Sequence, residues 1–95
     1  MDDVVKKRTF IWDKEYTVQY DMLARKHSPE MMERALLGVF WGIATNPQKY
    51  ERVTPKIYQA KSRPLGLAVP GFKVRFTMGD TENEIVLLWI EESES

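Results

Sequence analysis

The chain contains no cysteine, a single histidine and no long apolar run. Without cysteine there is no disulfide framework and no thiolate chemistry. One histidine leaves too few nitrogen and sulfur ligands for a zinc site, so we expect neither a metal nor a cofactor. No apolar run reaches the roughly 20 residues of a membrane-spanning helix, and the first ten residues lack the layout of a secretory signal. A cytoplasmic protein with no membrane partner is expected.

The sequence also lacks net charge, because its 14 basic and 14 acidic residues cancel. The two signs are nevertheless separated along the chain. Residues 46–79 carry 7 basic and 1 acidic side chains, giving +6, whereas residues 80–95 carry 6 acidic and no basic ones, giving −6. A basic block predicts a surface for anions or nucleic acid. The acidic end neutralises that surface if the two segments lie side by side.

Composition is that of an ordinary globular domain, with 43% hydrophobic and 29% charged residues. A length of 95 residues predicts one domain, 1–95, with loose ends at about 1–6 and 92–95.

Two helices are expected in the first half, after a short strand at 8–12. Segment 14–26 places Tyr16, Tyr20 and Leu23 at helical spacing, although the alternation of aromatic residues there also suits a hairpin strand; we favour the helix. Segment 29–44 has clearer helix signals, since Ser28 is a preferred N-cap and the following proline suits the first turn.

The second helix is more apolar than one buried stripe requires. Its core stripe is expected at Met32, Leu36, Val39 and Ile43. The additional apolar residues either widen the contact with the core or present a patch to a protein partner. The candidate partner-binding residues are Leu37, Phe40 and Trp41.

Three strands are expected in the second half, at 56–61, 72–78 and 84–91, after a loop at 46–54. The last is almost continuously apolar, which indicates a central strand covered on both faces. The order strand, helix, helix and three strands predicts an α+β fold: a small twisted antiparallel sheet with two N-terminal helices packed on one side.

Alternation within these strands predicts a basic face. Phe72, Val74 and Phe76 should point to the core while Lys73 and Arg75 point away from it. If the strands pair, five cations share one surface, although lysines on sheets also serve as solvated or edge-protecting residues. The candidate phosphate-binding residues are Lys56, Lys61, Arg63, Lys73 and Arg75.

From 8 to 91 the chain resembles the RelE/ParE toxin superfamily of type II toxin–antitoxin systems. The resemblance lies in the order of elements and in several short segments, namely 36–39 (LLGV), 46–47 (NP), 56–61 (KIYQAK), 72–76 (FKVRF) and 84–90 (EIVLLWI). It implies a toxin neutralised by a cognate antitoxin. RelE-like members cut messenger RNA on the ribosome with basic sheet residues, whereas ParE-like members inhibit DNA gyrase without acting as nucleases.

Carried onto this sequence by position, the resemblance implies that the five candidate phosphate-binding residues are the counterparts of those basic residues. The candidate catalytic residues are Arg63, Arg75 and Tyr58. The chain departs from the nuclease members because it is neutral and has no tyrosine or histidine after the last strand. Cleavage needs an acid and a base near the phosphate, and the nearby candidates are Tyr58, Glu91 and His27. Each also has a purely structural interpretation. Tyr58 can be an aromatic residue of the sheet, Glu91 a solvated carboxylate at a strand end, and His27 a surface residue.

Three functions therefore remain open. The first is a ribosome-dependent mRNA endonuclease that uses the basic face. The second is a non-catalytic toxin that binds gyrase or another protein. The third is an interaction protein of the same fold without toxicity.

Overall fold

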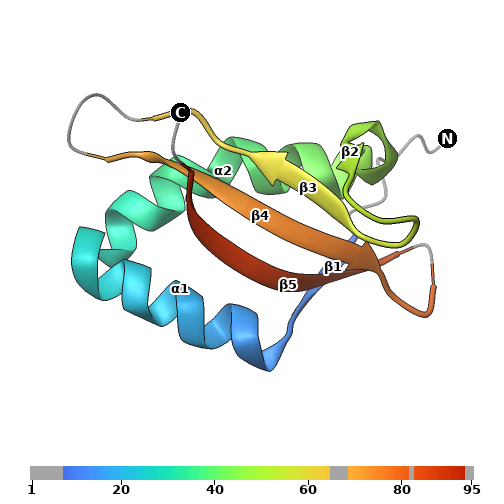
Figure 1. The fold of residues 1–95 in the computed structure, drawn as a ribbon, viewed down its shortest axis with the longest axis horizontal. Helices are drawn as coiled ribbons and strands as arrows, with labels where there is room; N and C mark the ends of the chain where they lie inside the picture. The colour runs from blue at the N-terminus through green and yellow to red at the C-terminus, as the bar shows by residue number, and fades with distance from the viewer. Residues whose placement is uncertain (1–7, 65–68, 82, 94–95) are drawn as a thin grey trace, which may run out of the picture.

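The computed structural model describes residues 8–64, 69–81 and 83–93. The elements follow the order β1 (Thr9–Trp12), α1 (Lys14–His27), α2 (Pro29–Thr45), the 3-10 helix η1 (Pro47–Lys49), β2 (Glu51–Arg52), β3 (Tyr58–Lys61), β4 (Gly71–Met78) and β5 (Glu84–Ser93). In Figure 1 the sheet lies in front of α2, and α1 runs below β5.

Both helices begin at a capping residue, Asp13 for α1 and the predicted Ser28 for α2. The Asp13 carboxylate accepts a hydrogen bond from the Glu15 backbone N–H, and the Ser28 hydroxyl accepts one from Met31 N–H at 3.2 Å. Ser28 also ends α1, with its own N–H donating to the Ala24 carbonyl and a φ of 97° that separates the two helices. The expected helices at 14–26 and 29–44 are confirmed, and the hairpin alternative for the first is excluded.

The sheet has five strands in the order β1-β5-β4-β3-β2 and is mixed. The antiparallel sheet that we expected is therefore wrong at one edge, where β1 pairs with β5 in parallel. Strands β1 and β5 are separated by both helices and three strands along the chain, so no tight hairpin constrains them to run in opposite directions.

Other boundaries differ from the sequence-based expectation. A short strand, β2, lies within the expected loop 46–54. The strand expected from 56 starts instead at Tyr58, because the Thr54 hydroxyl and carbonyl accept hydrogen bonds from Ile57 N–H in a tight turn. Strand β5 continues to Ser93, which pairs with Gly71, so residues 92 and 93 are ordered contrary to our expectation. The expected loose end 1–6 lies outside the described residues.

The core lies between the helices and one face of the sheet. Strand β4 contributes Phe72, Val74 and Phe76, all fully buried, and the predicted α2 stripe is buried with them. Strand β5 changes its alternation at a bulge: Arg75 pairs with Trp89, whereas the next residue, Phe76, pairs with Leu87.

The bulge explains the continuous apolar run of β5 without a second covering layer. Ile85, Leu87 and Ile90 are fully buried, whereas Val86 and Trp89 remain half-buried. The prediction that this strand is covered on both faces is therefore wrong. We call the uncovered side the open sheet face; the register assigns to it Gln59, Lys61, Lys73, Arg75, Thr77, Trp89 and Glu91.

Candidate phosphate-binding site

Cations gather where β3 ends and β4 begins. Lys61 pairs with Lys73 across the two strands, and Arg75 lies two positions further along β4, opposite Gln59. Arg63 follows β3 closely and is exposed. We call these four residues, Lys61, Arg63, Lys73 and Arg75, the cationic corner.

The cationic corner is only partly neutralised by the protein. Like charges directly opposite each other on neighbouring strands destabilise a sheet. The Lys73 ammonium lies 3.7 Å from the Glu91 carboxylate, which offsets one of the two charges. Among the described residues no carboxylate lies within 4.0 Å of the Lys61 or Arg63 side-chain nitrogens. These two cations are therefore available to an external anion.

Arg75 is held in place by a chain of hydrogen bonds. Its Nε donates to Gln59 Oε1 at 3.2 Å, and Gln59 Nε2 donates to Glu51 Oε1 at 3.4 Å. Gln59 is only 9% exposed, so its amide is a fixed support. The contact uses Nε, and no described residue bonds to the two terminal nitrogens of Arg75. That pair of nitrogens is the group with which arginine binds phosphate by two parallel hydrogen bonds.

A carboxylate is fixed beside these cations. Glu91 Oε1 accepts a 2.6 Å hydrogen bond from Trp89 Nε1, while its Oε2 faces the Lys73 ammonium. Glu91 is therefore oriented by two contacts and does not hang free at a strand end. Trp89 and Gln59 belong to the site, but no sequence signal indicated them. The β5 bulge and the start of β3 two residues later than expected determine which side chains share a face with Lys73 and Arg75.

The structure does not bring all of the predicted site residues together. Tyr58 is 5% exposed on the helix-facing side of the sheet, where its ring stacks on Phe76 at 5.3 Å and the Arg52 guanidinium lies 5.1 Å from its centroid. The alternation of strands puts Tyr58 and Lys61 on opposite faces. Lys56 lies before β3, at the end of the strand that is far from the cationic corner. Its backbone carbonyl accepts a hydrogen bond from the Thr77 hydroxyl.

His27 is also remote from the corner's open face, and it is not the surface residue that we expected. Its side chain is 9% exposed and packs edge-on against Phe72, with ring centroids 5.7 Å apart. Its Nε2 lies 2.8 Å from Glu92 Oε2, which also pairs with Lys26. Hydrogen bonds from Lys26 and then His27 hold the pKa of Glu92 below its ordinary value. This cluster fastens the end of β5 to the end of α1.

The cationic corner borders a hollow of about 530 Å³ between α2, η1 and the end of β3. Its floor is made by small and apolar residues of α2, and Lys49 adds a further cation to its rim. The lining residues are Ala35, Gly38, Val39, Lys49, Tyr50, Lys61, Ser62 and Arg63.

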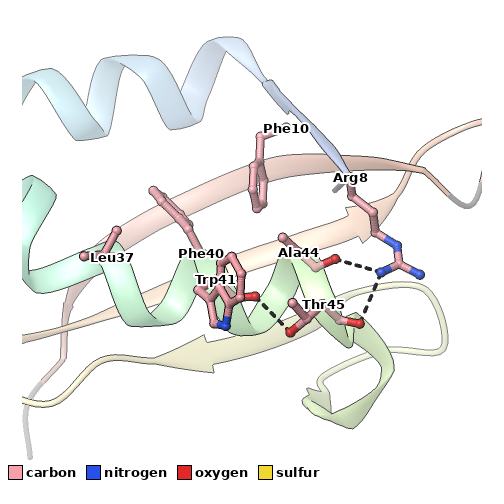
Figure 2. Close-up of a pocket in the computed structure, with 7 residues that line it drawn as sticks. All are labelled: Arg8, Phe10, Leu37, Phe40, Trp41, Ala44 and Thr45. Carbon is pink, nitrogen blue, oxygen red and sulfur yellow. Dashed lines mark hydrogen bonds between the residues drawn. The ribbon is translucent and has the colours of Figure 1, made fainter. Parts of the chain in front are cut away.

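A second hollow, of about 290 Å³, is apolar (Figure 2). Phe10 on β1 and Phe40 on α2 point toward each other with ring centroids 5.3 Å apart, and Arg8 donates to the Ala44 carbonyl at 2.8 Å. Leu37 is 72% exposed and Trp41 is 61% exposed on its rim. Of the predicted partner-binding residues, two are thus exposed, and Phe40 forms a half-buried wall.

Two classes of site have no counterpart in the part of the chain that the structure describes. Within 8–64, 69–81 and 83–93, no three histidine, cysteine or acidic residues lie together as metal ligands do. No helix there has both the length and the apolarity needed to cross a membrane.

Comparisons with family profiles, with curated proteins and with solved structures found no match. The similarity to RelE/ParE toxins therefore rests on the sequence segments given above.

Proposed function

We propose that the protein is a RelE/ParE-like toxin that binds the phosphodiester backbone of RNA at the cationic corner. The supporting observation is the pairing of Lys61 with Lys73 next to Arg63, where two cations have no carboxylate partner among the described residues. A phosphate placed there relieves the repulsion between the paired lysines and meets the free nitrogens of Arg75.

We further propose cleavage with Glu91 as the base in place of Tyr58. The Glu91 carboxylate takes the proton of a ribose 2′-hydroxyl, and the 2′-oxygen forms a bond to phosphorus while the bond to the 5′-oxygen breaks. Water protonates the leaving 5′-oxygen, and the products are a 2′,3′-cyclic phosphate and a 5′-hydroxyl end. Lys61, Arg63 and Arg75 stabilise the charge that develops on the phosphoryl oxygens.

Binding is tested with a single-stranded RNA oligonucleotide over a range of salt concentrations. Three phosphate contacts, at about 0.7 each, predict a slope of about −2 in log K against log salt, or roughly 20-fold weaker binding from 50 to 200 mM. The double variant Lys61→Ala/Arg63→Ala should reduce the magnitude of the slope by about 1.4. Lys56→Ala, an exposed lysine at the other end of β3, is the matched control. Equal effects of these variants would refute the assignment of the corner.

Activity is tested by induced expression in a bacterial host, with growth and transcript 5′ ends recorded together. We expect growth arrest with new 5′ ends inside codons. Arg75→Ala should abolish the arrest in a chain that still folds, with the stability lowered by the loss of the hydrogen bond to Gln59. Glu91→Gln should abolish the new ends while RNA binding persists. Arrest without new ends would contradict the nuclease proposal and favour a protein target such as gyrase.

A further inference from the structure

The side chains of the open sheet face stand in rows across the three central strands, β3, β4 and β5. Paired residues on neighbouring strands share a face, so the register defines each row. One row consists of Lys61, Lys73 and Glu91, and the next consists of Gln59, Arg75 and Trp89. The rows are two residues apart along each strand, which is about 7 Å. In Figure 1 none of the described helices lies in front of β4 and β5, so a ligand can reach both rows.

Trp89 offers an aromatic surface that no other ring of the described chain uses. It is half-buried, and none of the aromatic or cation–π pairs among the described residues includes it. Trp12, by contrast, packs against Tyr16 and Tyr20, with ring centroids 5.0 and 4.8 Å away. Both helices pack against the other face of the sheet. The Trp89 indole is therefore available to a planar ligand.

The orientation of this indole is fixed by the site itself. Its Nε1 donates a 2.6 Å hydrogen bond to Glu91 Oε1, and the other oxygen of that carboxylate lies 3.7 Å from the Lys73 ammonium. An indole, a carboxylate and an ammonium thus hold fixed positions relative to one another. A group that is already held in its binding orientation loses little conformational entropy when the ligand arrives.

The charge of the surface decreases along β4, away from the cationic corner. Beyond Trp89, Val86 pairs with Thr77 and Ile11 pairs with Val86, and none of these three residues is charged. Ile11 is 41% exposed. The surface therefore has a cationic end and an apolar, aromatic end that are one row apart. A ligand that matches it carries an anionic group next to a planar ring, as a nucleotide does.

We propose that Trp89 is the stacking platform for one nucleobase of the single-stranded RNA whose phosphate lies at the cationic corner. Because the indole is bonded to Glu91, the base on Trp89 and the ribose 2′-hydroxyl at Glu91 belong to the same nucleotide, on the 5′ side of the bound phosphate. Proteins commonly bind unpaired bases on aromatic side chains, and such stacking tolerates any base because each has a π-face. This inference rests on the proposed RNA binding at the cationic corner.

The test compares a single-stranded RNA oligonucleotide with an abasic oligonucleotide that has the same number of phosphates. One stacked base predicts that the natural chain binds the complete RNA about 5-fold to 150-fold more tightly. Trp89→Ala should remove this preference by weakening the binding of the complete RNA alone, whereas Trp89→Phe should keep most of it. Trp41→Ala is the matched control, since this tryptophan is 61% exposed on α2, and it should keep the preference unchanged.

The salt dependence separates this inference from the proposal on which it rests. Stacking adds no phosphate contact, so Trp89→Ala should keep the slope of log K against log salt at about −2. Equal binding of the complete and abasic oligonucleotides by the natural chain, with that slope retained, would overturn the role of Trp89 and leave the cationic corner intact. This comparison does not depend on the folding of any variant. A slope that Lys61→Ala/Arg63→Ala leaves unchanged, or no binding of either oligonucleotide, would refute the corner and the stacking platform together.

Discussion

Tyr16→Phe should stabilise the protein. The Tyr16 side chain is 0% exposed and packs between Trp12 and Tyr20, with ring centroids at 5.0 and 6.0 Å. Its hydroxyl is buried without a hydrogen-bond partner in the described part of the chain. A buried, unpaired hydroxyl costs about 1–3 kcal/mol. Phenylalanine keeps the ring and leaves a void of about one oxygen atom, worth about 0.3 kcal/mol. The free energy of unfolding should therefore rise by about 1–2 kcal/mol.

Urea denaturation at pH 7 measures this change, and thermal unfolding should show a Tm higher by at least about 4 °C. The pH dependence supplies a second test. Burial, followed by the charge of Tyr20, raises the pKa of Tyr16. The folded state then keeps a proton that the unfolded chain loses above pH about 10, so stability falls as the pH rises above that value. The free energy of unfolding of the Tyr16→Phe variant should therefore fall less than that of the natural chain as the pH rises above about 10.

Tyr20→Phe is the control, because Tyr20 is half-buried and its removal should change the stability at pH 7 by less than about 0.5 kcal/mol. A Tyr16→Phe variant that is less stable than the natural chain by 1 kcal/mol or more would refute the reasoning. That result would mean that the hydroxyl has a partner, and its loss would then be costly.

Two further predictions concern the helices and the end of β5. Gly38→Ala should stabilise the protein by about 1 kcal/mol because its Cβ meets no atom, whereas Gly42→Ala should destabilise it because Tyr50 must move. Urea denaturation measures the change in the free energy of unfolding for each variant. Changes of the same sign would contradict the packing of Tyr50 against Gly42. Glu92→Gln should remove stability at pH 7 and have no effect below the pKa of Glu92, which Lys26 and His27 hold below its ordinary value. The contribution of the Glu92 carboxylate to stability is lost as the pH falls through that pKa. A difference in the free energy of unfolding between the two chains that does not shrink as the pH is lowered from 7 would refute the prediction.

Local signals determined the helices and most of the strands. Ser28 and Pro29 predicted the start of α2 because capping is decided within one turn. The stripe from Met32 to Ile43 predicted its buried side because side chains on a helix repeat with a fixed period. The alternation of β4 predicted Lys73 and Arg75 on the uncovered face for the same kind of reason.

The composition of the site depended on pairing between distant segments, which alternation within one strand cannot specify. The β5 bulge shifted Trp89 and Glu91 onto the open sheet face beside Lys73 and Arg75. The turn at Thr54 set the start of β3, and the register placed Tyr58 on the buried face opposite the cationic corner. Parallel pairing of β1 likewise had no local signal, because its partner lies at the other end of the chain. The sequence by itself determined the helices, the strands of the second half and their basic alternation. Only the tertiary structure decided which charges meet, since a shift of one residue in register turns every side chain of a strand to the other face.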